Sequence, residues 1–239
     1  MAIVADKMYF PLFLSAAKKK FKTLKEKSNN FDSDWNLSND FYFGLKRKSL
    51  NFNISSLQKK TEISRLVKNV ENIKPKIILE IGTAGGGTLF YWTRVSQPDA
   101  IIISIDLPFG RFGSGYLPTK AKFLKCLARQ NQKIFLIPGD SHKNETLDKL
   151  NKILCGRKID FLFIDGDHTY PGIKSDFYIY SKLVRSGGII ALHDIMYHKF
   201  DTDAKVYKFW NEIKKLYSYE EYIESPDQDG YGLGVIYIK

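Results

Sequence analysis

The stretch LEIGTAGGGT (Leu79–Thr88) places four glycines directly after a run of apolar, β-branched residues. That run, residues 76–81, is typical of a buried strand, and residues 87–95 have helical character. In open α/β sheets, a glycine-rich turn from a strand into a helix binds nucleotides, because the backbone approaches the ligand and presents N–H groups to it. The stretch therefore predicts an α/β fold with a ligand site at this turn.

The glycine-rich turn departs from the dinucleotide fingerprint G-x-G-x-x-G. Ala84 stands at the second glycine of that pattern, and Glu80 comes shortly before the first, Gly82. A carboxylate there would repel a pyrophosphate, which argues against a nicotinamide dinucleotide. The same carboxylate suits a ligand with a positive amino or sulfonium group. A tight strand–helix turn without a ligand is the alternative.

Strands and helices alternate along the rest of the chain. Further strands are expected at residues 100–105, 133–137, 159–164, 188–192, 219–223 and 233–238, and helices at 58–73, 119–129, 144–154, 171–184 and 203–216. Near-continuous apolar strands between amphipathic helices predict a mostly parallel, doubly wound sheet covered on both faces, with the last strand pair as an antiparallel edge. Residues 1–55 show no clean period. We expect a helical or irregular extension over residues 1–57, followed by one domain over residues 58–239.

Polar residues follow the second and third strands of this pattern. Asp106 ends the second strand, where a carboxylate can accept both hydroxyls of an adenosine ribose. Asp140 and Ser141 follow the third, and Asp140 can accept a hydrogen bond from an adenine amino group. Its alternative role is to cap the helix expected at residues 144–154.

A second polar cluster follows the fourth and fifth strands. The fourth ends in Asp165, Asp167 and His168, and the fifth in His193 and Asp194. If the two strands are neighbours, Asp165, His193 and Asp194 converge at one edge of the sheet. A divalent cation would neutralise such a group: oxygen ligands favour Mg²⁺, and a histidine ligand shifts the preference toward Mn²⁺, Fe²⁺ or Zn²⁺. A hydrogen-bonded polar network without metal is the alternative.

The net charge of +11 is concentrated in the N-terminal third. Residues 1–75 hold 15 basic and 7 acidic side chains, with a run of lysines at residues 18–27. A segment of this kind suits a solvated helix, and it could also touch a membrane surface, an anionic glycan or nucleic acid. The apolar residues 8–17 carry their positive charge mainly after them, unlike a signal peptide, and two cysteines fit a reducing compartment. We expect a cytoplasmic protein.

The motifs LEIGTAGGGT, ISIDLP, PGDSH, DFLFIDGDHTYPGIKSDF and LVRSGGIIALHDI occur in this order over residues 58–239. Together they resemble a class I S-adenosylmethionine (SAM)-dependent methyltransferase. Within that class they are similar to the branch named after cephalosporin hydroxylase and the macrocin and rhamnosyl O-methyltransferases. Residues 1–55 match no family that we can name.

The resemblance implies a Rossmann-like, seven-stranded sheet with SAM along its first three strands. The cofactor-binding residues would be Glu80, Gly82, Thr83, Gly85, Gly86, Asp106, Asp140 and Ser141. It further implies Mg²⁺ or Mn²⁺ held by Asp165 and Asp194, with His193 where an acidic residue is often found. Asp167 resembles the proposed base of the family, and His168 is the other candidate within reach.

These expectations predict O-methyl transfer to a hydroxyl of a sugar, a glycan or a small natural product, by an enzyme that forms homo-oligomers. Three alternatives stay open. One is a metal-dependent hydrolase or oxygenase-like enzyme, which would leave the glycine loop without a role. The second is a nucleic-acid methyltransferase that uses the basic N-terminus, although the N/D-P-P-Y/F signature of amino-methylating enzymes is absent. The third is a SAM-binding protein without catalytic activity.

Overall fold

A computed structural model describes residues 30–39, 42–44, 51–54, 56–109, 116 and 118–239. The lysine-rich segment at residues 18–27, for which we considered contact with a membrane, lies outside these residues. Among the described helices, none has the length and apolar character that a bilayer crossing requires.

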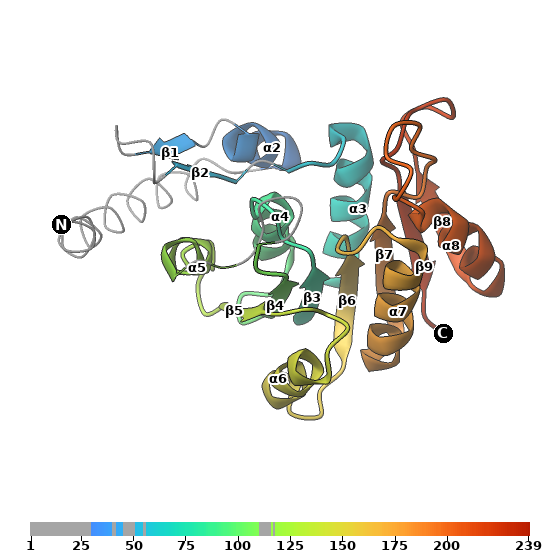
Figure 1. Ribbon diagram of the computed structural model, residues 1–239. Helices are drawn as coiled ribbons and strands as arrows, with labels where there is room; N and C mark the ends of the chain where they lie inside the picture. The colour runs from blue at the N-terminus through green and yellow to red at the C-terminus, as the bar shows by residue number, and fades with distance from the viewer. Residues whose placement is uncertain (1–29, 40–41, 45–50, 55, 110–115, 117) are drawn as a thin grey trace.

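The centre of the fold is a seven-stranded sheet (Figure 1). Its strands are β3 (Ile77–Ile81), β4 (Ile101–Asp106), β5 (Lys133–Pro138), β6 (Ile159–Ile164), β7 (Val184–His193), β8 (Ser218–Tyr222) and β9 (Leu233–Tyr237). Their spatial order is β5-β4-β3-β6-β7-β9-β8, and β3 to β7 pair in parallel. Strand β9 runs antiparallel between β7 and β8, so the antiparallel strand is next to the edge rather than at it. The predicted fold class is confirmed.

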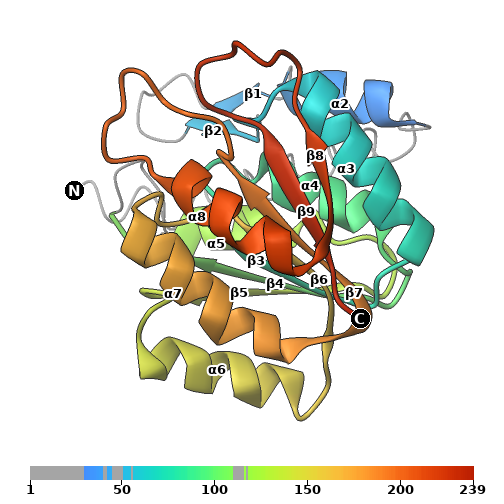
Figure 2. The ribbon, with the colours of Figure 1, turned by 90° about the vertical axis from the view of Figure 1, so that its right-hand side faces the viewer.

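Helices cover both faces of the sheet (Figure 2). They are α3 (Lys60–Ile73), α4 (Gly87–Val95), α5 (Pro118–Lys125), α6 (Asn144–Leu154), α7 (Tyr170–Tyr180) and α8 (Val206–Ile213), with short 3₁₀ turns η1 (Ser181–Leu183) and η2 (Lys214–Leu216). Side chains of α3, α4 and α5 form one hydrophobic core with one face of the sheet, and those of α6, α7 and α8 form a second core with the other. Strands that are buried on both faces explain the nearly continuous apolar runs in the sequence.

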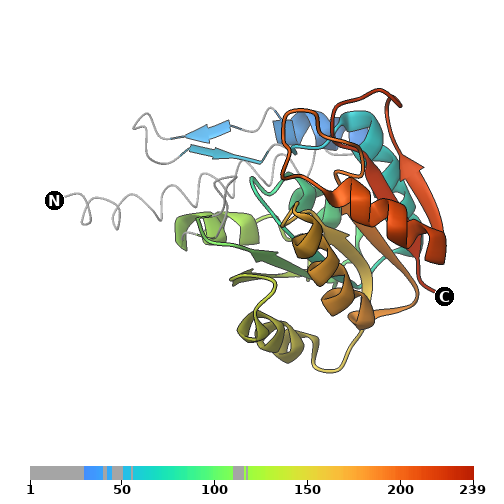
Figure 3. The ribbon, with the colours of Figure 1, turned by 45° about the vertical axis from the view of Figure 1, so that its right-hand side comes forward.

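The N-terminal extension contributes helix α2 (Phe31–Asn39) and a hairpin of β1 (Tyr42–Gly44) and β2 (Asn51–Asn53). Both lie on the α3–α4 side of the sheet (Figures 1 and 3). The helix fits the expected helical or irregular extension, whereas the hairpin was not anticipated. Because Trp35 stacks on Tyr91 of α4 and Arg94 pairs with Asp34, this part packs directly on the sheet's helical layer. The division at residue 57 stays a prediction.

The chain changes direction within the sheet at β3. It runs from β3 outward through β4 and β5, then returns to β6 on the other side of β3. Such a reversal opens a crevice beyond the carboxyl ends of the strands, which is where open α/β sheets bind ligands. The glycine loop after β3 and the polar residues after β4 to β7 all lie at this edge.

Candidate functional site

A cavity of about 740 Å³ lies at the carboxyl edge of the sheet. Its floor comes from the residues that follow β3, β4, β5, β6 and β7. Its remaining wall comes from residues 56–58, from the segment between β7 and α8, and from Tyr231. The glycine loop (residues 82–87) and the acidic cluster (Asp165, His168 and Asp194) are more than 70 residues apart in sequence. They therefore line the same cavity.

The glycine loop forms one end of the cavity. Gly82, Thr83 and Gly85 line it, whereas Gly86 is the N-cap of α4, with φ of +93°. Gly82 has φ of +86°, and a Cβ built on it would lie 1.9 Å from the carbonyl oxygen of Asp165. A residue with a side chain is excluded there on both counts. The loop is thus open to a ligand on one side and closely packed against the end of β6 on the other.

Glu80 is fully buried and is not among the residues that line the cavity. Its carboxylate accepts hydrogen bonds from Thr88 Oγ1 at 2.5 Å, Trp92 Nε1 at 2.9 Å and Ser104 Oγ at 3.1 Å. Burial raises the pKa of Glu80 to about 7, against the opposing effect of these hydrogen bonds. The side chain thus joins β3 to α4 and β4 behind the loop, and its role as a direct cofactor ligand stays a prediction.

The other expected cofactor residues line the cavity. Asp106 is buried at the end of β4, and Asp140 and Ser141 follow β5. The hydroxyl of Tyr180 on α7 donates to the Ser141 carbonyl oxygen at 2.6 Å, which fixes the backbone of this turn. The structure therefore brings the carboxylates expected for ribose and adenine to the same side of the cavity as the glycine loop.

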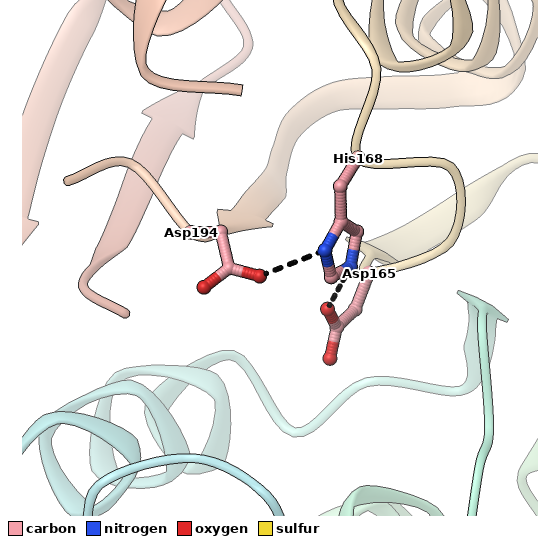
Figure 4. A group of neighbouring side chains, drawn as sticks. All are labelled: Asp165, His168 and Asp194. Carbon is pink, nitrogen blue, oxygen red and sulfur yellow. Dashed lines mark ion pairs between the residues drawn. The ribbon is translucent and has the colours of Figure 1, made fainter. Parts of the chain in front are cut away.

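The acidic cluster forms the other end of the cavity. Asp165 follows β6, Asp194 follows β7, and the imidazole of His168 lies between them (Figure 4). His168 Nε2 is 3.3 Å from Asp165 Oδ1, and Nδ1 is 3.2 Å from Asp194 Oδ2. One ligand atom from each of these residues fits within 4.8 Å of the others, a spacing that suits a shared metal ion.

His193, which we expected in this group, faces the same two carboxylates. Its Nδ1 is 3.1 Å from Asp165 Oδ1 and 3.2 Å from Asp194 Oδ2. Its Nε2 is buried without a hydrogen-bond partner in the described structure. Burial lowers the pKa of His193, but the charges of Asp194 and Asp165 outweigh that effect and raise the pKa well above its usual value. The acidic cluster therefore has two imidazoles as candidate third donors.

The outer oxygens of both carboxylates are held by other groups. Asp165 Oδ2 accepts from Gln58 Nε2 at 2.7 Å. Asp194 Oδ1 accepts from the backbone N–H of Tyr231 at 3.1 Å and lies 3.0 Å from His198 Nε2. Asp194 also has a left-handed backbone, with φ of +61°. Each aspartate thus has one oxygen held by a neighbouring donor and the other turned toward the imidazoles, as in metal sites whose carboxylate ligands are oriented by hydrogen bonds.

Asp167, the candidate base, lines the cavity beside His168. Its Oδ1 accepts from the backbone N–H of Thr169 at 2.9 Å, and a Cβ on Gly172 would lie 2.1 Å from its Cγ. The start of α7 therefore packs directly against this carboxylate. Both candidate bases lie within the cavity, and their catalytic roles stay predictions.

Several lining residues were not foreseen from the sequence. Gln58 comes from the segment before α3 and carried no recognisable signal. The chain has four histidines, and all of them, His142, His168, His193 and His198, line the cavity. The scarcity of histidine together with this clustering is a signal that could have pointed to His142 and His198.

The comparisons with known proteins fit this geometry. Residues 79–195 match a family model described as a methyltransferase domain. This stretch runs from β3 to just beyond Asp194, so the domain holds both the glycine loop and the acidic cluster. The resemblance to class I SAM-dependent methyltransferases is confirmed. A comparison with curated proteins finds no match.

Solved structures share the fold of the methyltransferase domain. An O-methyltransferase from Bacillus cereus in complex with SAH has a TM-score of 0.56 at 19% identity, over 73% of this chain and 79% of that one. The O-methyltransferase TomG from Streptomyces achromogenes, in complex with SAM, has a TM-score of 0.50 at 18% identity, over 74% of this chain and 81% of that one. Cofactor-bound Rv0187 from MTB has a TM-score of 0.50 at 18% identity, over 92% of this chain and 91% of that one. At these identities the likeness shows the fold alone.

Proposed function

We propose that the protein is a SAM-dependent O-methyltransferase that uses a divalent cation. The observation that carries the proposal is the single cavity in which the glycine loop and the Asp165–Asp194 pair face one another. A methyl donor and an acceptor hydroxyl must lie side by side for transfer, and the cavity has a separate set of polar groups at each end. Proximity and alignment of this kind supply much of the rate in displacement reactions.

The donor end of the cavity is formed by the glycine loop, Asp106 and Asp140. The loop presents backbone N–H groups at the start of α4, and Asp106 accepts hydroxyl hydrogen bonds at the end of β4. When bound, SAM supplies an electrophilic sulfonium methyl group and leaves as S-adenosylhomocysteine (SAH). The chain's task at this end is to bind and orient.

The acidic end fits a divalent cation. Asp165 and Asp194 would hold it through the oxygens that face the imidazoles, with His168 or His193 as a third donor. Gln58 and His198 already fix the outer carboxylate oxygens, so the inner ones need little rearrangement. Mg²⁺ suits the oxygen ligands, and an imidazole ligand would favour Mn²⁺. A bound cation would lower the pKa of an acceptor hydroxyl that coordinates it.

Two residues can take the proton from the acceptor hydroxyl. Asp167 and His168 lie side by side in sequence, and both line the cavity at its acidic end. A positioned base of this kind contributes roughly 10²–10⁴-fold to the rate of a proton-coupled reaction. Removing the proton leaves the acceptor oxygen with the electron pair that forms the new bond to the methyl carbon.

The acceptor is a hydroxyl of a sugar, a glycan or a small natural product. Leu57 and Tyr231 line the cavity, and both are exposed to solvent, over 57% and 39% of their surface respectively. Apolar and aromatic side chains at a cavity mouth suit the ring of such a compound. Cytoplasmic location and self-association remain parts of the proposal that need their own measurements.

Calorimetric titration tests the proposal directly. The full chain is titrated with SAM in the presence of Mg²⁺, Mn²⁺ or EDTA, and separately with each metal. Micromolar SAM binding that does not need metal, together with metal binding lost in Asp165→Ala, supports the proposal. The exposed Asp148 on α6 provides the matched control, and Asp148→Ala keeps both affinities.

The turnover of Asp165→Ala then decides the role of the metal. With a screen of sugar, glycan and phenolic acceptors, this variant loses methyl transfer while its SAM affinity stays within a few-fold of wild type. Full turnover in Asp165→Ala contradicts the metal role. Metal binding without SAM binding contradicts the methyl-transfer proposal and leaves a metal-dependent hydrolase as the better interpretation.

A further inference from the structure

A buried carboxylate that the proposed chemistry does not use lies behind the donor end of the cavity. Asp176 is on α7 and has no exposed surface. Neither of its oxygens has a hydrogen bond of ordinary geometry in the described structure, and its charged neighbour is His142, whose Nε2 is 3.3 Å from Oδ1. Burying a carboxylate without hydrogen bonds costs free energy of folding, so the presence of Asp176 beside His142 needs an explanation.

His142 connects Asp176 to the lining residue Asp140. Its Nε2 also lies 3.2 Å from the carbonyl oxygen of Gly172, and its Nδ1 is 3.3 Å from Asp140 Oδ1. The backbone N–H of His142 donates to the same Asp140 oxygen at 2.9 Å. Both ring nitrogens are therefore turned to protein groups, although the residue lines the cavity.

The charge on His142 follows from these neighbours. The close approach of the Asp176 carboxyl group raises the pKa of His142 to about 9, against the opposing effect of burial. The groups that face the imidazole are Asp176 and the Gly172 carbonyl from α7, and Asp140 from the turn after β5. The charge of Asp167, which lies in the loop before that helix, also acts on Asp176. Burial in turn raises the pKa of Asp176. The imidazole of His142 thus lies between two carboxyl groups, those of Asp176 and Asp140.

We propose that Asp176 and His142 are positioning residues that hold the Asp140 carboxylate for recognition of the adenine amino group of the methyl donor. The inference rests on the proposed function, because it assumes that the donor end binds SAM. Both contacts from His142 go to Asp140 Oδ1. The carboxylate is thereby turned so that Oδ2 can accept a hydrogen bond from a ligand. Asp176 acts through His142 and touches no ligand itself.

Ligand discrimination separates this role from ordinary structural support. The probes are SAH and its inosine counterpart, in which a carbonyl replaces the 6-amino group. A carboxylate accepts from the amino group and repels the carbonyl oxygen, and a hydrogen bond to a charged group is worth enough for the wild type to prefer SAH by about tenfold or more. A defect in folding or packing lowers the affinity for both ligands equally. If the Asp140 carboxylate is no longer held in place, the preference for SAH over the inosine compound falls.

The variants are Asp176→Asn, which keeps the shape of the side chain, and His142→Asn. Asp148→Asn on the neighbouring α6 is the matched control. We expect the preference for SAH to fall by about fivefold in both variants, with the affinity for the inosine compound changed by less than about twofold. Thermal unfolding of each variant, with and without SAH, verifies that the ligand-binding form is folded.

Each outcome decides a different point. A wild-type protein that binds SAH and prefers it, with an unchanged preference in both variants, overturns the inference and leaves the proposed function standing. Wild-type binding without any preference also overturns it, because Asp140 then does not read the amino group. If the wild type does not bind SAH at all, both the inference and the proposed function are wrong.

Discussion

The carbonyl oxygen of Asp165 lies where a side chain on Gly82 would begin, 1.9 Å from the position of its Cβ. Gly82 starts the glycine loop after β3, and Asp165 starts the acidic cluster after β6. The first residue of the glycine loop and the first residue of the acidic cluster are therefore in direct backbone contact, where β3 and β6 lie side by side. A change at the loop cannot be absorbed without moving the carboxylate that is proposed to hold the cation.

Gly82→Ala tests this contact. We expect it to cost more than about 3 kcal/mol in the free energy of unfolding, because a steric clash with backbone adds to an unfavourable φ. Gly156→Ala is the matched control: Gly156 has φ of +77° but nothing within 4 Å of a Cβ, so it should cost only about 1–2 kcal/mol. Urea denaturation of both variants measures the difference. Equal costs would show that the contact is unimportant.

Glu80→Gln tests the pH dependence of stability. The folded pKa of Glu80, about 7, lies above the ordinary value of 4.5. Its contribution is therefore fully present below pH 4.5 and is lost as the pH rises through 7. The wild type should lose up to about 3 kcal/mol relative to the glutamine variant across this window. Unfolding measured at pH 4.5, 6 and 8 checks this; parallel curves for the two proteins would mean that Glu80 ionises normally.

The stability contribution of His142 should also depend on pH. Its folded pKa is about 9, above the ordinary 6.5, so the contribution is complete below pH 6.5 and disappears as the pH rises through 9. The difference in unfolding free energy between wild type and His142→Asn should therefore shrink from pH 6 to pH 9.5. Asp176→Asn, which removes the partner of His142, should remove most of this pH dependence. A constant difference would contradict an imidazolium at this position.

Gln58→Ala tests the hydrogen bond that holds Asp165 of the acidic cluster. The Gln58 amide donates to the outer oxygen of Asp165 at 2.7 Å. Loss of a hydrogen bond that orients a metal ligand weakens metal binding by about 10–100-fold, and we expect a decrease of this size in the affinity for Mn²⁺. Gln97→Ala is the control, since the Gln97 amide bonds the Lys74 carbonyl oxygen instead. Calorimetric titration with Mn²⁺ gives both affinities. SAM affinity should stay near the wild-type value in each variant.

The sheet and the residues at its carboxyl edge could be predicted because both depend on local pattern. Apolar strands, amphipathic helices and the glycine loop are each visible within a short window, and the ends of neighbouring parallel strands must meet. The convergence of Asp165, His193 and Asp194 followed from that rule. The insertion of β9 between β7 and β8 was not foreseen, although the polar, mostly exposed β8 suits the edge of the sheet better than the buried β9.

Contacts between distant segments escaped prediction. Gln58 reaches Asp165 across 107 positions, and no periodicity or spacing marks it. Glu80 was expected to face the ligand, yet the hydroxyl and indole donors of Thr88, Trp92 and Ser104 draw it behind the loop. Alternation along the strand decides to which face a side chain points, but its hydrogen-bond partners come from other elements. Sequence reasoning could place Glu80 near the carboxyl edge of the sheet without giving its hydrogen bonds.

The wall formed by residues 56–58, by the segment that carries His198 and by Tyr231 lies outside the five parallel strands. On the proposed function, donor binding and acceptor choice would therefore be encoded in separate parts of the chain. Exchange of these peripheral segments between related enzymes should transfer acceptor preference while the donor end is inherited unchanged. A family built in this way can diversify its products by varying surface loops, at little risk to the hydrophobic core.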